Sequence, residues 1–91
     1  MYYTYILTSI KNNRYYIGST DDLTRRLSEH NSGKVFFTKL YIPWKIYYFE
    51  KYQTRSQAFS REKQIKAWKS RSMIEKLKFT RPRPSRDEVG K

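Results

Sequence analysis

Two short Tyr-rich segments joined by a turn constrain the fold of this chain more than any other feature of its sequence. Residues 2–9 (YYTYILTS) alternate between two faces and are rich in aromatic and β-branched residues, which is typical of a strand. Residues 11–14 (KNNR) predict a turn, because asparagine tolerates a left-handed backbone, and residues 15–19 (YYIGS) predict a returning strand. We therefore expect the chain to begin with an antiparallel hairpin.

A helix and a third strand are predicted after the hairpin. Thr20 or Asp21 can cap the start of the helix, and Gly33 marks its end. Residues 44–52 (WKIYYFEKY) predict the strand. This segment is more apolar than strictly alternating, so we expect it to be covered on both faces.

The second half of the chain predicts two more helices. Thr54 and Gln57 have the spacing of a capping box, so a helix is expected from there to about Lys69. Ser70 or Ser72 begins a short third helix. The order of elements is then β-β-α-β-α-α.

This order defines the α+β class, with a small three-stranded, mostly antiparallel sheet flanked by helices. A chain of 91 residues has room for one domain, which we assign to residues 1–79. Residues 80–91 contain two prolines and little to bury, so we expect a disordered basic tail.

The charge of the chain limits its partners. Twenty Lys and Arg against eight Asp and Glu give a net charge of +12, which predicts a polyanionic partner, with nucleic acid the commonest. The alternative is that the charge serves solubility and gives a weak preference for anionic membranes. Without cysteine, a signal peptide or an apolar run near the roughly 20 residues of a membrane span, we expect a cytoplasmic monomer without thiolate metal sites.

The first predicted helix carries two polar side chains where core residues belong. At spacings of three and four, one face holds Leu23, Arg26, Leu27 and His30, whereas Arg25 points to solvent. Alone, His30 fits a half-buried histidine bonded to a carbonyl. Arg26 alone fits a side chain whose stem covers apolar surface. Both on one turn indicate a functional site.

A carboxylate lies within the apolar face of the second predicted helix. Ala58, Phe59 and Ile65 define that face, and Glu62 falls inside it. A buried carboxylate is costly unless it is paired, hydrogen-bonded or metal-bound. A salt bridge to a lysine or arginine and a role as metal ligand both remain open.

The hairpin adds tyrosines to this set. Tyr5 shares a face of the first strand with Tyr3 and Leu7, and Tyr16 shares a face of the second strand with Gly18. A glycine inside a strand marks a bulge or the close approach of another group. Most of the tyrosines are expected to be core residues.

These side chains suit the hydrolysis of a phosphodiester if they converge on one cleft. Arg26 can clamp the phosphate and stabilise the charge of the transition state. Glu62 can hold one Mg²⁺ that keeps most of its waters. A tyrosine or histidine can take the proton of an attacking water, and the sequence leaves open which one.

The chain resembles the GIY-YIG nucleases over roughly residues 2–79. Residues 3–7 (YTYIL) resemble the first motif with Tyr3 in place of its first glycine, and residues 16–18 (YIG) match the second outright. The interval, the following DDLTRRLSEHNSG helix and the glutamate of SREKQIKAWK complete the pattern. Ser19 stands where some repair-type members carry a lysine.

The resemblance implies a three-stranded sheet flanked by helices, and a nuclease that uses one divalent ion, Mg²⁺ or Mn²⁺. The catalytic residues that it implies are Tyr5, Tyr16, Arg26, His30 and Glu62, of which Glu62 is the metal ligand. Within the family, the chain is most similar to the small stand-alone bacterial members.

Two hypotheses about function follow. The first is a Mg²⁺-dependent endonuclease acting on DNA in preference to RNA, including structured, damaged or single-stranded DNA. The second is a nucleic-acid-binding module without catalysis, with basic helix residues on phosphates and loop aromatics on unpaired bases. The basic residues are Lys63, Lys66, Lys69 and Arg71, and the aromatics are Phe36, Phe37 and Tyr41.

Overall fold

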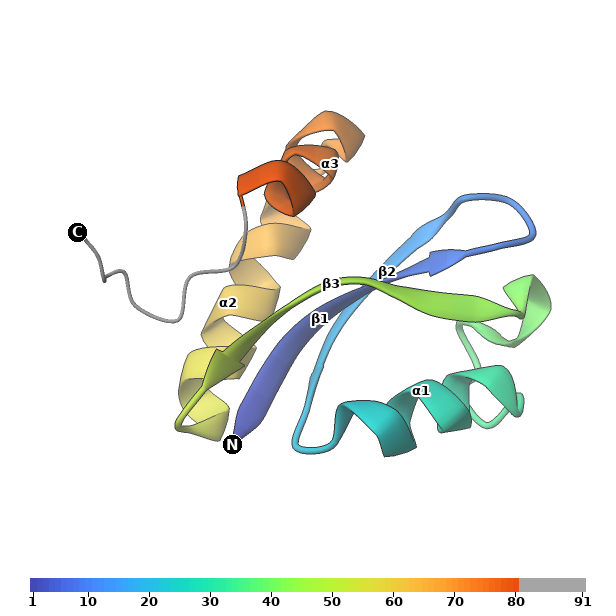
Figure 1. Ribbon diagram of the computed structural model, residues 1–91, viewed down its shortest axis with the longest axis horizontal. Coiled ribbons are helices and arrows are strands. Elements are labelled where there is room, and N and C mark those ends of the chain that lie inside the picture. The colour runs from blue at the N-terminus through green and yellow to red at the C-terminus, as the bar shows by residue number, and fades with distance from the viewer. Residues whose placement is uncertain (81–91) are drawn as a thin grey trace.

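The computed structural model describes residues 1–80 and has the predicted order of elements (Figure 1). The predicted tail lies almost wholly outside the described residues, so the domain boundary stays a prediction. The elements are β1 (Tyr2–Ser9), β2 (Tyr15–Thr20), α1 (Leu23–Asn31), a 3-10 turn η1 (Lys39–Tyr41), β3 (Trp44–Tyr52), α2 (Arg55–Trp68) and α3 (Arg71–Thr80).

The three strands form one antiparallel sheet in the order β2-β1-β3. In the β1–β2 hairpin, Tyr5 pairs with Gly18 and Leu7 pairs with Tyr16. Since directly opposed residues of paired strands point to the same face, these four positions share one face of the sheet. The α+β class predicted from the sequence is confirmed.

The strand that is buried on both faces is β1, not β3. Residues 4–9 of β1 are all buried, whereas Lys45 and Phe49 of β3 are exposed. The prediction that residues 44–52 are covered on both faces was therefore wrong. Its cause is the strand order, which places the first strand in the centre and the third at an edge.

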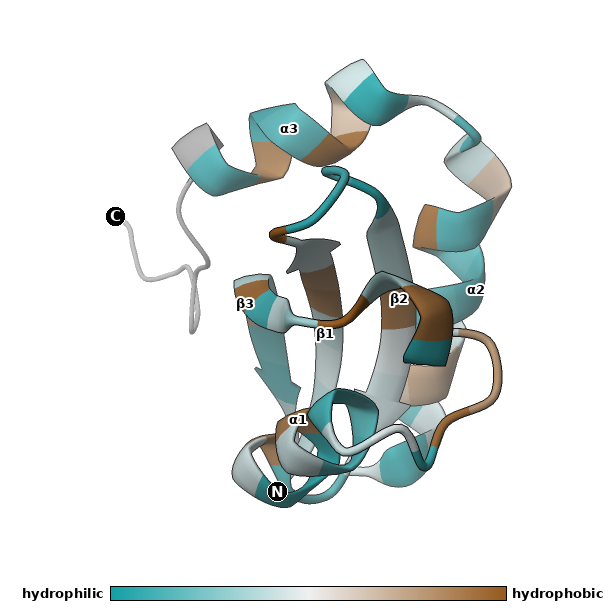
Figure 2. Ribbon diagram, turned by 90° about the vertical axis from the view of Figure 1, so that its right-hand side faces the viewer, coloured by the Kyte–Doolittle hydropathy of each residue, from teal (hydrophilic) through white to brown (hydrophobic). Residues whose placement is uncertain are grey.

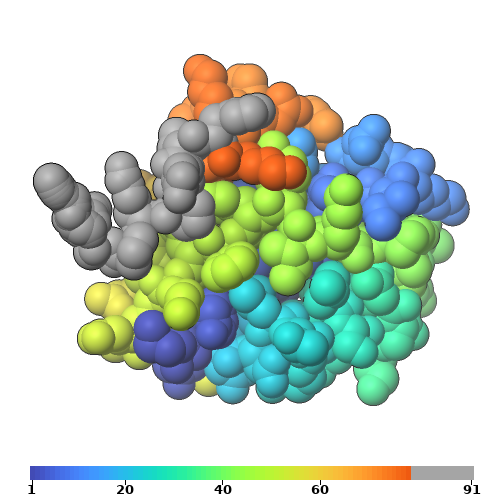
Figure 3. Space-filling model, in the orientation of Figure 1, coloured from blue at the N-terminus to red at the C-terminus, as the bar shows by residue number. Residues whose placement is uncertain are grey.

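The helices divide between the two faces of the sheet. In Figure 1, α1 lies on one side of the strands, and α2 and α3 lie on the other. Tyr5, Leu7 and Trp44 form the core beneath α1 with its two leucines. The core on the α2 and α3 side is larger and consists of Ile6, Tyr48, Ile65, Ile74 and Leu77. Figure 3 shows α1, in cyan and teal, packed along β3.

The helix ends follow the predicted chemistry with one correction. Asp22 caps α1 by accepting a hydrogen bond from the Arg25 backbone, so neither Thr20 nor Asp21 is the cap. Thr54 opens α2 with the predicted capping box. Gly33 has a φ of +84° just beyond α1, a left-handed conformation that favours glycine at a helix end.

One predicted core residue of α2 is at the surface. Phe59 is 51% exposed, while Ala58 and Ile65 are buried. Phe59 follows Ala58 directly, so it lies about 100° further round the helix, past the edge that the sheet covers. Among the described residues no helix combines the length and the apolar character needed to cross a membrane.

Candidate active site

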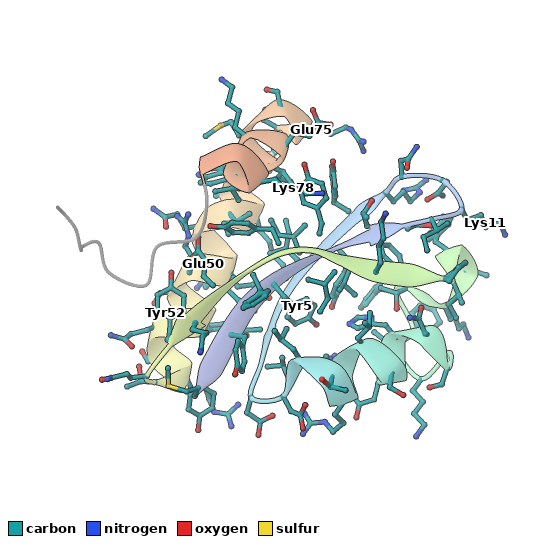
Figure 4. All side chains as sticks on the ribbon, viewed as in Figure 1. Tyr5, Lys11, Glu50, Tyr52, Glu75 and Lys78 are labelled. Carbon is teal, nitrogen blue, oxygen red and sulfur yellow. The ribbon has the colours of Figure 1, made fainter. Side chains whose placement is uncertain are left out.

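Tyr5 occupies the centre of the candidate site, between the sheet and α1 (Figure 4). Its side chain is 2% exposed, and its hydroxyl lies against the backbone of Gly18 on the neighbouring strand. A Cβ atom on Gly18 would lie 2.6 Å from the Tyr5 hydroxyl oxygen and 2.7 Å from Cζ. The close approach that the glycine predicted is therefore the approach of Tyr5.

His30 is hydrogen-bonded to the Tyr5 hydroxyl from helix α1. Its Nε2 lies 3.0 Å from the Tyr5 oxygen, and its Nδ1 lies 2.8 Å from Oγ1 of Thr38. Thr38 donates its own hydroxyl proton to the Val35 carbonyl at 3.4 Å. Nδ1–H then donates to Thr38, and Nε2 accepts from Tyr5, which gives one continuous chain of hydrogen bonds.

The burial of His30 keeps its ring neutral. None of the residue is exposed to solvent. Burial, and then the positive charge of Arg26, lower the pKa of His30 to about 4, with only Glu29 acting in the other direction. A neutral ring with a free Nε2 lone pair is the form that can accept the Tyr5 proton.

Burial also keeps Tyr5 protonated. It raises the pKa of the Tyr5 hydroxyl to about 12, and the nearby Tyr16 and the carboxylate of Glu62 add to that effect. The guanidinium of Arg26 beside the hydroxyl opposes the shift, both as a hydrogen-bond donor and as a positive charge. Arg26 is thus the group that favours removal of the Tyr5 proton.

Arg26 and Arg25 differ as the helical periodicity predicts. Arg26 lies one turn before His30 and is directed toward Tyr5, while its Nη1 also pairs with Glu29 Oε1 at 2.9 Å. Arg25 is half-exposed and pairs with Asp21 at 3.0 Å and with Glu29 at 3.4 Å. Only Arg26 can act on a group bound at Tyr5.

Tyr16 completes the cluster on the α1 face. Its half-buried ring lies 4.9 Å from the His30 ring and 6.5 Å from the Tyr5 ring, measured between centroids. The structure therefore brings four of the five predicted site residues together, from β1, β2 and α1.

Glu62 reaches the site from α2, on the far side of the edge strand β2. Its Oε1 accepts a hydrogen bond from Ser19 at 2.8 Å, and its Oε2 pairs with Lys66 at 2.7 Å. Glu62 therefore contacts β2 at Ser19, and Tyr5 contacts the same strand at the preceding residue, Gly18. The salt bridge that the sequence left open is present, although the Lys66 side chain is 50% exposed.

Glu62 fits a Mg²⁺ only as a single protein ligand. In the part of the chain that the structure describes, no three His, Cys, Asp or Glu side chains form a group able to hold a metal ion. Mg²⁺ commonly keeps several waters and binds through one or two carboxylates together with a substrate phosphate. The Glu62 carboxylate beside Ser19, with 13% of its side chain exposed, suits that mode of binding.

The four predicted basic contacts lie along α2, at its C-terminal end and at the start of α3. Lys66 pairs with Glu62, and Lys63 covers the ring of Phe59 at 5.4 Å. Lys69 and Arg71 line a groove of about 300 Å³ between the hairpin and α3. The role of these four residues in binding nucleic acid stays a prediction.

The loop after α1 contributes the residue that the sequence did not reveal. Thr38 is fully buried, bonds His30 through its side chain and accepts a hydrogen bond from Trp44 Nε1 at 2.8 Å on its carbonyl. A threonine within an aromatic loop carries no motif or periodicity, so no sequence signal pointed to it.

A second carboxylate network lies away from the site. Glu50 is paired with Arg61, with Nε 2.9 Å from Oε1, and both Tyr48 and Tyr52 donate to its carboxylate. Figure 4 shows Glu50 and Tyr52 beside α2, far from α1. The Arg61 guanidinium, with the two tyrosines, holds the pKa of Glu50 below its usual range against the effect of burial.

Comparisons with known proteins agree on one family. The profile of the GIY-YIG catalytic domain matches residues 1–78. A UPF0213 protein of Listeria welshimeri is 42% identical over 66 residues, 71% of this chain and 72% of that protein. A UPF0213 protein of Haloquadratum walsbyi is 38% identical over 68 residues, 74% and 75% of the two chains. The solution NMR structure of UPF0213 protein BH0048 from Bacillus halodurans superposes with a TM-score of 0.55 at 30% identity, covering 92% of this chain and 89% of that one.

Proposed function

This chain belongs to the GIY-YIG catalytic-domain family, and on that premise we propose that it is a divalent-metal-dependent endonuclease that hydrolyses phosphodiester bonds in DNA. The observation that carries the proposal is the hydrogen bond between Tyr5 and a buried, neutral His30, beside Arg26. A net charge of +12 supports a polyanionic substrate.

Arg26 is the proposed phosphate ligand. A guanidinium can donate two parallel hydrogen bonds to phosphate oxygens and stabilise the charge that develops on them in the transition state. The Arg26 side chain is one-third exposed, so it can be reached from solvent. Glu29 pairs with Arg26 in the free protein and holds the guanidinium at the rim of the site.

Tyr5 and His30 are the proposed proton acceptors, acting as a pair. As a water attacks phosphorus, the Tyr5 oxygen takes its proton, and the hydroxyl proton of Tyr5 passes to Nε2 of His30. This transfer avoids a free tyrosinate, which a pKa of about 12 would disfavour. A phosphate bound at Arg26 offsets the positive charge that lowers the pKa of His30, so substrate makes His30 a better acceptor.

Glu62 is the proposed metal ligand. A bound divalent ion would stabilise the negative charge on the leaving oxygen. Ser19 orients Glu62 through its hydrogen bond, and the half-exposed Lys66 can swing into solvent when the carboxylate takes another partner.

The test is cleavage of labelled duplex, single-stranded, flap and junction DNA in Mg²⁺, Mn²⁺ and EDTA. We expect cleavage of at least one substrate with metal and none with EDTA. Arg26→Ala should slow this cleavage about 10²-fold or more, whereas Arg25→Ala, a change of the same charge on the adjacent residue, should retain it. Absence of cleavage across the whole panel would contradict the proposal.

A non-catalytic nucleic-acid-binding module is the second candidate. The observation that favours it is the Glu62–Lys66 pair, because the pair satisfies the carboxylate without a metal ion. This candidate predicts binding to the same DNA panel with no cleavage in either metal.

A further inference from the structure

We propose that Phe36 and Phe37 form a binding subsite for unpaired nucleobases next to the active site, so that the substrate is DNA with a single-stranded segment. This inference rests on the proposed function for the class of ligand. Its basis is exposure: Phe36 is 71% exposed and Phe37 is 78% exposed, more than any other phenylalanine whose exposure the structure describes.

The two exposed rings are held in a defined arrangement by the residue that follows them. Their centroids lie 5.5 Å apart with the ring planes at 82°, so the two faces point in different directions. Thr38, the next residue, is fully buried and bonded to His30 and Trp44. The anchor at Thr38 holds the backbone in place and leaves the two preceding side chains in solvent.

The same anchor links the subsite to the proposed catalytic residues. His30 contacts Thr38 through Nδ1 and Tyr5 through Nε2, so the aromatic loop and the proton acceptors share one hydrogen-bonded chain. Figure 2 shows that the loop after α1, with its hydrophobic stretch in brown, passes on the β2 side of the sheet and not on the β3 side. Glu62 also adjoins β2, through Ser19.

The charges around the rings favour nucleic acid as the occupant. The Lys39 ammonium lies 5.0 Å from the centre of the Phe36 ring, and Lys34 is exposed two residues before it. Two adjacent aromatic rings flanked by lysines suit a single strand, whose bases stack on the rings while its phosphates lie near the lysines. These lysines would contribute nothing to the binding of a purely apolar partner.

Unpaired bases are favoured over duplex for a geometric reason. In a duplex the face of each internal base is covered by its neighbours, so a protruding phenylalanine finds no free surface to stack on. A flap, gap or frayed end presents free faces, and stacking is tolerant of sequence because every base has one. The subsite therefore selects for structure and not for sequence.

The experiment measures binding of the whole protein to a labelled single strand and to the blunt duplex of the same sequence, in EDTA. The variant is Phe36→Ala/Phe37→Ala. The matched control is Phe59→Ala, since Phe59 is exposed on α2 and also lies under a lysine, Lys63 at 5.4 Å. We expect the double variant to bind the single strand about tenfold more weakly or worse, with duplex binding unchanged and Phe59→Ala affecting neither.

The inference would be overturned if the double variant lost affinity equally for both DNAs or for neither, or if Phe59→Ala caused the same loss of single-strand binding. It would also be overturned if the two phenylalanines served another occupant. That result would be a wild-type dimer that the double variant converts to monomer in sedimentation, or binding to neutral lipid vesicles that the double variant abolishes.

The test separates this inference from the nuclease proposal, because EDTA removes catalysis from the measurement. A protein that discriminates as expected but cleaves nothing would refute the endonuclease and support the base-binding subsite. A protein that cleaves DNA but shows no change in the double variant would support the nuclease and overturn the subsite.

Discussion

The hydroxyl oxygen of Tyr5 lies 3.0 Å from Nε2 of His30, in a space that exists because Gly18 has no side chain. The two residues are 25 positions apart in the sequence and come from a strand and a helix. The packing of α1 on the sheet is therefore what brings the hydroxyl and the imidazole together, and any change that shifts α1 should disturb both.

Gly18→Ala should destabilise the fold and displace Tyr5. The new Cβ would lie 2.6 Å from the hydroxyl oxygen of a ring that is buried on all sides and cannot turn away. Overpacking of this kind costs about 1–3 kcal/mol, and the near-ultraviolet circular dichroism of the tyrosines should change with it.

Gly33→Ala is the matched control for that variant. A Cβ on Gly33 meets no atom within 4 Å, but φ is +84°, so the cost comes from the backbone alone and is expected near 1 kcal/mol. Its tyrosine spectrum should stay that of the wild type. If Gly18→Ala melts at the wild-type temperature, the Tyr5 side chain does not lie where the structure places it.

The sequence predicted which side chains of α1 face the site, but not the loop residue that contacts them. Periodicity alone placed Arg26 and His30 on the inner face of α1 and Arg25 outside, because a helix repeat fixes which side chains share a face. It did not identify Thr38, whose position depends on a loop closing onto Trp44.

Strand order was the other limit. The apolar character of residues 44–52 suggested a strand covered on both faces, but local sequence does not encode which strand lies between the other two. Likewise, the pattern of α2 placed Phe59 in the core, since periodicity does not tell how far round a helix the sheet extends. Both errors concern tertiary arrangement and not the identity of an element.

Stability should fall between pH 6.5 and about 4 because of His30. The pKa is about 4 in the folded protein and 6.5 as the reference for the unfolded chain. Within this window the unfolded state binds a proton that the folded state does not, so the contribution is complete above 6.5 and is lost as the pH falls. The total is about 3 kcal/mol.

Urea unfolding at several pH values checks this prediction. His30→Gln is the control, because glutamine can hydrogen-bond but does not titrate, and its stability should vary less between pH 6.5 and 4.5. The carboxylates of Glu29 and Glu50, whose pKa values are lowered, act below this range. A wild-type protein with the same pH dependence as the variant would show that His30 is not buried in its neutral form.

Arg26→Ala and Arg25→Ala should differ sharply in catalysis. Loss of a group that stabilises transition-state charge typically costs about 3 kcal/mol or more in rate, near 10²-fold. Loss of the half-exposed Arg25, which pairs with surface carboxylates, should change binding by a fraction of that. Single-turnover cleavage rates at saturating protein measure the difference. Equal losses of rate in the two variants would show that Arg26 has no special role in catalysis.

Thr38→Val should slow cleavage by changing the orientation and tautomer of His30. Valine has nearly the shape of threonine but leaves Nδ1 of His30 without its acceptor at 2.8 Å. Thr38→Ser restores a hydroxyl and should recover most of the rate. The pH dependence of the cleavage rate distinguishes a positioning role of Thr38 from a packing role. Only loss of a positioning role should shift the acidic limb of that profile. Equal rates for the valine and serine variants would contradict the prediction.

Glu62→Gln is the last test, because the metal-ligand and ion-pair roles of Glu62 predict different combinations of results. The partner in the free protein is Lys66, which is half-exposed and stays hydrated when unpaired. The melting temperature in EDTA should therefore change little, since a pair with a half-exposed lysine contributes about 1 kcal/mol and the glutamine can still accept the hydrogen bond from Ser19. DNA affinity in EDTA should rise, because one negative charge is removed from beside the proposed phosphate site.

Cleavage and metal binding complete the comparison. If Glu62 holds the divalent ion, Glu62→Gln should abolish cleavage and weaken Mn²⁺ binding, followed by the relaxation of water protons, while Lys66→Ala should retain both because it frees the carboxylate. If Glu62 serves only its pair with Lys66, the two variants should have the same small effects on every readout. Cleavage by Glu62→Gln at the wild-type rate would remove the metal ligand from the proposed mechanism, and the reaction would then need another group to stabilise the leaving oxygen.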